Sequence, residues 1–429
     1  MQLPADTSEV ARAVARAHQD EWAYVLAATV RVTRDLDLAE DCVQDAYAQA
    51  LVHWSSSGIP RRPGAWLTTV ARRRALEQQR RAATLARKLP LLVVEDVSEP
   101  LDEEPDDMII PDDRLRLIFT CCHPALSTDA QLALTLRLVC GLTSAEVARA
   151  FLVKEATMQA RITRAKRKIA EARIPYRVPD ARDLPERVGV VLDAIHLLYT
   201  SGYVAASGDE LMRPDLTARA LHLARMMHVL LPDDPEVKGL LALLEMTEAR
   251  RAARVSPDGQ LVLMEDQDRS LWDRAAIDRG LRLVREALMC PPTGRYALMA
   301  AIAAVHAEAQ RWEDTDWPQL VGLYDLLLRR WPTPVVALNR AVALSFAAGP
   351  AEALAALDEL ADGASIDAYP YLAATRADLL RRLGRRCEAL AAYREALRLT
   401  HNAAEADFLR RRIGELQAAV STLDNSRAP

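Results

Sequence analysis

The sequence is poor in glycine and phenylalanine, with 15 Gly and 4 Phe among 429 residues. Glycine reaches about half of the ~7% share that is usual in proteins, whereas Ala, Leu and Arg are abundant. Half of the residues are hydrophobic, which excludes disorder over most of the chain. We therefore predict an all-α protein. At roughly 150 residues per domain, the length predicts two or three domains.

Other features are also missing. The sequence has no run of about 18 apolar residues, so we predict no membrane span, and its charged N-terminal segment lacks the apolar core of a signal peptide. Its six cysteines are scattered, which favours a reducing cytoplasm over a disulfide framework. Cys121, Cys122 and His123 are adjacent and have no C-x-x-C partner, which argues against a metal site. Phosphate-binding glycine loops, H-E-x-x-H and G-x-S-x-G are absent, so we expect neither an enzyme nor a cofactor.

The net charge of −5 is an average over segments of opposite sign. Residues 55–90 include nine basic residues and one acidic residue, residues 91–113 include ten acidic and no basic residues, and residues 154–177 include eight basic and two acidic residues. The acidic segment also has three prolines, which predicts an extended linker. A second proline-rich junction spans 175–185, and the two junctions divide the chain into three parts.

A helix predicted at 38–54 precedes the first basic segment. Its apolar residues recur at i, i+4, i+7 and i+11 and form one stripe: Val43, Tyr47, Ala50 and Trp54. The opposite face carries Asp41, Gln44 and Asp45, which in an isolated helix is typical of a solvated surface.

A loop rich in Ser, Gly, Pro and Arg leads to a second predicted helix at 65–81. Arg61 and Arg62 of the loop, together with the arginines of the helix, can hold phosphates. Thr, Gln and Arg side chains of the same helix can contact base edges. Trp54 and Trp66 lie on the apolar stripes, so we expect them in the core rather than as stacking platforms for bases.

The second basic segment has the pattern of a helix-turn-helix. Thr143 or Ser144 can cap a first helix, with Glu146 near its third position. The second helix has one inward stripe, formed by Met158, Ile162, Ala165 and Ile169. Its other faces are polar at the start and basic later, so early side chains can read bases while later ones, including Lys166 and Lys168, hold phosphates. The alternative is a basic hairpin packed on another subunit.

These segments resemble conserved regions two and four of bacterial extracytoplasmic-function (ECF) RNA polymerase sigma factors. The matching stretches are LAEDCVQDAYAQALVHW, GIPRRPGAWLTTVARRRALEQQRR and CGLTSAEVARAFLVKEATMQARITRAKRKI. The resemblance covers the first 175 residues or so. It implies two small helical sigma domains, with region two at 1–88, an acidic linker at 89–113 and region four at 114–177.

The resemblance implies core RNA polymerase and promoter DNA as partners. Asp41, Gln44 and Asp45 lie where the family docks on the clamp helices of the β′ subunit, and region four implies a contact with the β flap. The loop at 55–64 lies where a flipped base of the melted minus-ten element is held. The acidic linker lies in the path of the RNA in a positively charged polymerase channel, or else it is merely a flexible tether.

The resemblance also implies two sets of DNA-binding residues. The minus-ten set is Arg61, Arg62, Thr69, Arg72, Arg73, Leu76 and Arg80. The minus-thirty-five set is Thr157, Gln159, Arg161, Thr163, Arg164 and Arg167. Many relatives have Asn where this chain has Arg73, so no minus-ten base preference is carried over.

From residue 185 onward the sequence predicts helix after helix. Three pairs align at an offset of 35 or 36 residues: Ala341 with Ala377, Gly349 with Gly384, and Leu354 with Leu390. This offset is close to the ~34-residue tetratricopeptide period, and residues 296–331 form an earlier, degenerate repeat. Such arrays bind peptides or other domains on a concave face, or they serve as packing scaffolds.

The whole chain looks like the group of ECF sigma factors that carries a C-terminal tetratricopeptide-like extension with a DG…EDQDRS.W motif. The matching residues are Asp258, Gly259, Asp266, Asp268, Arg269 and Trp272. They form either a structural ion-pair network or a contact with the sigma core or an effector. The resemblance implies a helical extension at 178–290, helical repeats at 291–424 and a tail at 425–429, with the extension modulating activity.

We therefore expect a sigma factor that directs promoter-specific transcription and is regulated by its own C-terminal domain. The alternative is a DNA-binding regulator with a repeat sensor domain that never docks on polymerase. This alternative leaves the helix with Asp41 and Asp45 without a purpose. An interaction scaffold or a hydrolase is disfavoured by the basic segments and by the absent catalytic motifs.

Overall fold

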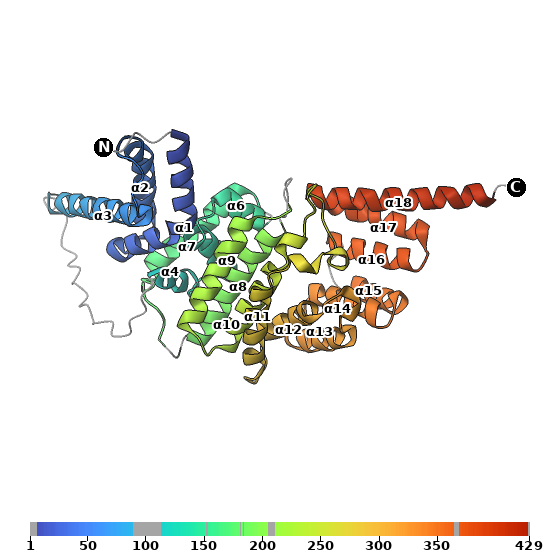
Figure 1. Ribbon diagram of the computed structural model, residues 1–429. Helices are drawn as coiled ribbons and strands as arrows, with labels where there is room; N and C mark the ends of the chain where they lie inside the picture. Colours follow the sequence, from blue (N-terminus) through green and yellow to red (C-terminus); the bar gives the residue numbers. More distant parts are fainter. Residues whose placement is uncertain are drawn as a thin grey trace. The chain divides into compact units, whose positions relative to one another are not determined.

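The computed structural model describes residues 7–88, 113–151, 153–180, 182, 184–204, 211–363 and 369–427. In these ranges the protein is all-α, as predicted, and an isolated β-bridge joins Val255 to Leu261 (Figure 1). The chain forms two compact units, Met1–Ala194 and Ile195–Pro429. Residues 89–112, which include almost all of the predicted acidic linker, lie outside the described residues.

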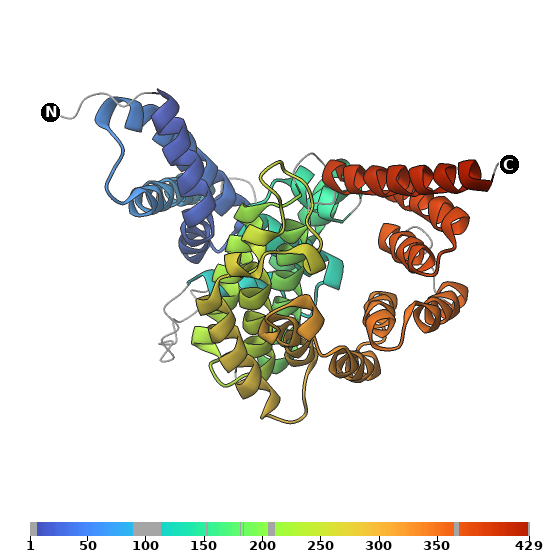
Figure 2. The ribbon, with the colours of Figure 1, turned by 45° about the vertical axis from the view of Figure 1, so that its right-hand side comes forward.

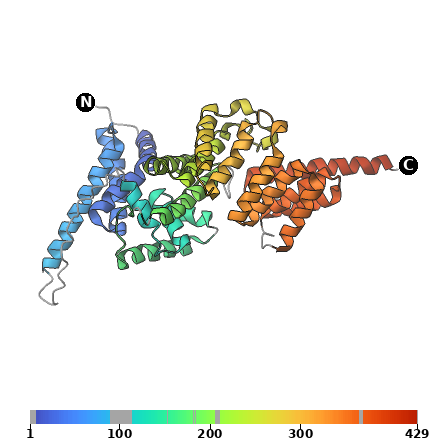
Figure 3. The same ribbon diagram turned by 90° about the horizontal axis from the view of Figure 1, so that it is seen from below.

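The first unit begins with three packed helices, α1 (Thr7–Thr33), α2 (Leu36–Ser57) and α3 (Pro63–Lys88). Asp35 caps α2 by accepting hydrogen bonds from two backbone N–H groups of its first turn. The helix ends where Gly58 adopts a φ of 82°. The predicted stripe of α2 is buried. In Figure 3, α3 extends past the other two helices.

The second half of this unit contains the predicted helix-turn-helix. α4 (Asp113–Cys121), α5 (Thr128–Leu134) and a π-helical turn at Thr135–Val139 lead into α6 (Ser144–Ala150) and α7 (Glu155–Glu171). Thr143 and Glu146 form the expected capping box at the start of α6. The predicted inward stripe of α7 is buried at all four positions, which confirms the helical register.

α8 (Leu184–Tyr203) crosses the boundary between the units and is followed by α9 (Pro214–Leu230) and α10 (Pro235–Glu248). α10 packs on α9, α11 (Arg274–Leu288) and α12 (Arg295–Glu308). Between α10 and α11 the chain forms short 3₁₀ turns, including Met264–Asp266 and Arg269–Leu271.

The repeats form stacked helical hairpins, as the sequence predicts. α12 pairs with α13 (Trp317–Arg330), α14 (Pro334–Ala347) with α15 (Pro350–Gly363), and α16 (Pro370–Arg382) with α17 (Arg386–Leu399); α18 (Ala403–Arg427) packs on α17. Ala341 and Ala377 are both buried, and Gly349 and Gly384 both have positive φ at the turns. Figure 2 shows the hairpins from α13 to α17 following a curve.

Gly239 of α10 sits where this helix crosses the start of α12. A Cβ there would lie 2.5 Å from the backbone N of Ala297, so the backbones must separate to admit one. We expect Gly239→Ala to lower the free energy of unfolding by about 1–3 kcal/mol, as overpacking does. At Gly322 of α13 a Cβ would meet nothing within 4 Å. There, Gly322→Ala should raise the free energy of unfolding by about 0.5–1 kcal/mol, measured by urea denaturation. Effects of the same sign for both variants would contradict this packing.

Candidate nucleic-acid and polymerase interface

The predicted minus-ten residues all lie on exposed surface. Arg61 and Arg62 precede α3, and the others share the face of α3 opposite its buried Leu67, Ala71 and Ala75. These exposed α3 residues are Thr69, Arg72, Arg73, Leu76 and Arg80. A large apolar side chain exposed on a basic face, as Leu76 is at 45%, is available to contact a base.

Two aromatic residues near the end of α2 contact Trp66 at the start of α3. Trp54 is fully buried, as predicted, and its ring meets Trp66 edge-on at 5.5 Å between centroids. Trp66 is only half-buried, and its ring also stacks on the exposed His53 at 5.6 Å between centroids. Trp66 therefore lies at the edge of the core beside the loop, whereas the sequence predicted it inside the core.

The predicted polymerase-binding residues lie together on α2. Asp41 and Gln44 are exposed, whereas Asp45 is half-buried and forms an ion pair with Arg74 of α3 at 3.0 Å. This ion pair links α2 to α3.

The predicted minus-thirty-five residues lie on α7, and most are exposed. The exposed members are Thr157, Gln159, Thr163, Arg164 and Arg167. Arg161 differs from them. Its side chain is only 24% exposed, lies 3.1 Å from the Asp129 carboxylate and covers the Phe151 ring. In this conformation Arg161 ties α7 to α5 and α6.

Sequence reasoning missed an ion-pair cluster that joins region two to region four. The Lys166 ammonium of α7 donates to Glu40 at 2.6 Å and to Asp37 at 2.8 Å, both on α2. Arg137, in the π-helical turn, donates to the other oxygen of Glu40. The side chains of Glu40 and Lys166 are 7% and 10% exposed. Lys166 is thus buried in this cluster, although it was expected among the phosphate-holding residues.

The cluster is electrically balanced, with two carboxylates facing two cations. Burial tends to lower the pKa of Lys166, but the Glu40 and Asp37 carboxylates outweigh it, and the net shift is upward. A signal was present in the sequence: Glu40 lies three residues before Val43, in line with the apolar stripe of α2. A charged residue on a buried stripe needs a partner.

Other contacts extend the interface between the two regions. The Trp22 indole of α1 donates to the Leu138 carbonyl at 3.0 Å. The Tyr176 hydroxyl lies 2.9 Å from the Ala27 carbonyl oxygen and 3.1 Å from that of Asp113. Burial raises the pKa of this phenol strongly. Regions two and four therefore form one compact body.

The DG…EDQDRS.W motif is divided between the core and an exposed turn. Trp272 packs in the core, and Arg269 stacks on it at 4.6 Å while donating to the His306 and Ala309 carbonyls. Asp268 caps the short helix that contains Arg269. Asp258, Gly259 and Asp266 are exposed. Arg269 is thus held by carbonyl oxygens and an aromatic ring, whereas an ion-pair network was one of the two roles expected for the motif.

Comparisons with known proteins match this architecture. Residues 21–84 match the sigma-70 region 2 family, residues 116–169 match sigma-70 region 4, and residues 187–288 match a family of unknown function, DUF6596. The two sigma-70 matches cover α2, α3 and the helix-turn-helix, and they place the chain in the sigma-70 class.

Individual proteins of similar sequence identify the family within the sigma-70 class. The ECF RNA polymerase sigma factor SigK of Mycobacterium sp. (strain KMS) is 32% identical over 31% of this chain and 68% of its own length. SigK of Mycolicibacterium vanbaalenii is 30% identical over 35% of this chain and 77% of its own length. An uncharacterised protein of Rhizobium meliloti (strain 1021) is 42% identical over 93% of this chain and 94% of its own length. The chain belongs to the ECF RNA polymerase sigma factor family and carries a long helical extension.

The ion-pair cluster predicts that Lys166 holds the two regions together. Lys166→Met keeps the apolar stem but removes two charge-assisted hydrogen bonds, which should weaken the closed arrangement by about 2 kcal/mol. Pulsed electron spin resonance between labels at Ser56 and Thr163 should then show longer, broader distances. So that the labels attach only at these two positions, the exposed Cys290 and Cys387 are replaced by Ser in all variants. Lys168→Met, at an exposed site on the same helix, is the control, and equal distributions for the two variants would refute the role of Lys166.

Proposed function

We propose that this protein is a promoter-specificity subunit of RNA polymerase that acts in the cytoplasm by binding rather than by catalysis. The observation that carries the proposal is one compact unit that combines sigma-70 regions two and four, each with an exposed basic helix. Asp41, Gln44 and Asp45 would dock on the β′ clamp, and region four on the β flap. In this proposal residues 1–88 and 114–177 are the two functional regions.

The exposed helices suggest how a promoter would be read. The arginines of α3 would hold phosphates of the melted minus-ten element, while the preceding loop captures an unstacked base. The start of α7 would enter the major groove of the minus-thirty-five element, with Thr157 and Gln159 near base edges and Arg164 and Arg167 on phosphates. The acidic segment, outside the described residues, would lie in the channel that RNA follows.

The closed unit must open before it can act in this way. The two promoter elements are about 25 base pairs apart, or ~85 Å along B-form DNA. Lys166 of α7 bonds directly to α2, so regions two and four cannot span that distance while the cluster is intact. We therefore propose that docking on polymerase replaces the contacts of Glu40 and Asp37 and releases α7 for DNA.

Transcription with purified core polymerase tests the proposal. We expect the full chain to bind core enzyme and to give promoter-specific run-off transcripts from a genomic promoter library. Arg164→Ala with Arg167→Ala should reduce transcript yield, and it should reduce the slope of log affinity against log salt by about 2, because two phosphate contacts are lost.

Arg410→Ala is the matched control, since Arg410 is exposed on α18, pairs within its own helix and lies in the other unit. Duplex binding without any binding to core polymerase would instead favour a DNA-binding regulator that is not a polymerase subunit.

We further propose that the C-terminal extension regulates the sigma unit, and that its repeats contact a protein or peptide partner. A chain ending at Arg177 should change the yield of run-off transcript while keeping the start site, because the proposed promoter-reading residues all precede this point. Primer extension on the same templates checks this. A shifted start site would show that the extension takes part in promoter choice.

A further inference from the structure

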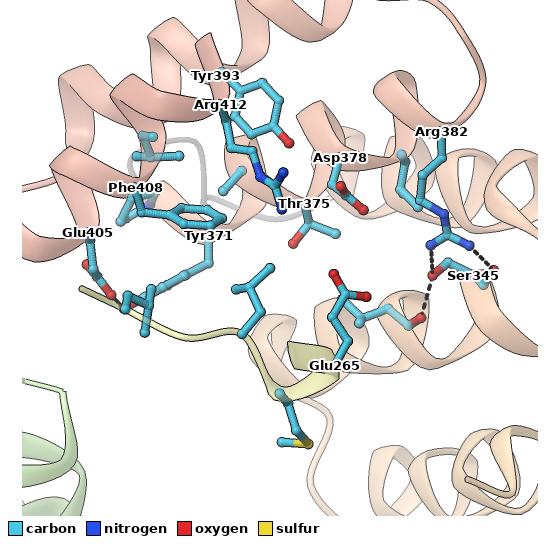
Figure 4. A pocket seen from close by; sticks show the side chains of 18 of the residues that line it. Glu265, Ser345, Tyr371, Thr375, Asp378, Arg382, Tyr393, Glu405, Phe408 and Arg412 are labelled. Carbon is cyan, nitrogen blue, oxygen red and sulfur yellow. Dashed lines mark hydrogen bonds between the residues drawn. The ribbon is translucent and has the colours of Figure 1, made fainter. Parts of the chain in front are cut away.

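A cavity of about 340 Å³ lies in the second unit, between the repeats and the segment that follows the DG turn. Its walls come from residues 261–265, α14, α16 and α18, so segments more than a hundred residues apart meet there (Figure 4). The volume is within the ~300–1,000 Å³ range of small-molecule sites. The sigma-70 matches end before this region of the chain.

Most of the cavity wall is apolar. Leu261 and Leu263 line it from one side, and Phe346, Phe408 and Leu409 line it from the repeats. An apolar ligand body would remove this surface from water, which is the main source of affinity in such sites.

The polar groups in the cavity favour a cation. The Glu265 carboxylate points into the cavity toward Thr375 and Asp378 in Figure 4. Among the described residues, Glu265 has neither a hydrogen-bond nor an ion-pair partner. Desolvation raises the pKa of Glu265, the nearby Asp266 and Asp378 carboxylates raise it further, and these effects outweigh the lowering by Arg412 and Arg381. A cation placed here would relieve this repulsion.

The arginines that line the cavity already have partners. Arg382 donates to the Ser345 hydroxyl at 2.8 Å and to its carbonyl at 2.9 Å, and it lies over the Phe346 ring. Arg412 donates to Glu415 at 3.0 Å and lies over Phe408. Both guanidinium groups therefore form part of the walls and are already engaged, so a ligand anion would face the Glu265 carboxylate with neither arginine free of a partner.

We propose that this cavity binds a small organic cation, a protonated amine on an apolar body, with Glu265 as the residue that receives the ammonium group. Thr375 would accept a second hydrogen bond, and the leucine and phenylalanine side chains would surround the apolar part.

The same segment connects the cavity to α8. Val262 donates to the Arg254 carbonyl at 2.9 Å, and Arg254 in turn stacks on Tyr203 at 3.6 Å and donates to its carbonyl at 2.6 Å. A ligand that holds residues 261–265 would therefore restrain the end of α8. Any effect of this restraint on transcription rests on the proposed function, whereas binding itself does not.

Calorimetry with the full chain tests the site without polymerase. The probes are 2-phenylethylamine, the neutral 2-phenylethanol and the anionic 3-phenylpropanoate, at neutral pH. We expect the amine to bind at least about tenfold more tightly than the other two, the ratio expected from one charge-assisted hydrogen bond. Preference for the carboxylate or the alcohol, or no binding of any probe, would overturn the proposal.

Two variants locate the amine. Glu265→Gln keeps the shape and removes the charge, and it should weaken amine binding about tenfold or more. Glu359→Gln, an exposed position on α15, is the matched control and should leave binding unchanged. Ala374→Leu should weaken binding of the amine by filling the cavity from α16. Unchanged amine affinity in Glu265→Gln, with circular dichroism confirming the fold, would refute the site.

Discussion

The first unit depends on one buried carboxylate. Glu40 lies on the apolar stripe of α2, and burying its charge is tolerated only because Lys166 and Arg137 both bond to it. Those two cations belong to region four, so the stability of α2 in its helical bundle and the position of the helix-turn-helix are set by the same interaction. Removing either cation would leave the buried Glu40 carboxylate with one charged partner instead of two, which lowers the stability of the unit.

The arrangement of charges explains how a chain of negative net charge can still present basic helices. A chain with net charge −5 has little general attraction for DNA. The basic residues are nevertheless concentrated on α3 and α7, and one cation of α7 is occupied by α2 in the closed form. Under the proposed function, promoter binding would be weak for the free protein and would strengthen when polymerase competes for the carboxylates of α2. By linkage, this proposed coupling would be reciprocal: DNA that engages α7 would favour polymerase at α2 by the same factor.

Much of the local structure was predictable from sequence, because period and capping are local properties. The stripe of α7, the Thr143 cap and the offset between Gly349 and Gly384 follow directly from residue spacing. Contacts between distant segments were not predictable in this way. The sequence gives no distance between Lys166 and Glu40, and an outward-facing lysine on a basic helix is ordinarily solvated. The residues assigned to DNA and polymerase stay predictions from family resemblance and surface exposure.

The curved stack of hairpins has a mechanical consequence. Each hairpin of the repeats packs mainly on its neighbours, so a small rotation at one interface is carried forward by all the hairpins that follow it. The cavity residues on α14, α16 and α18 belong to three successive layers of the stack. Small rotations between successive hairpins would add up along the stack. The end of the stack farthest from the first rotation would therefore be displaced most.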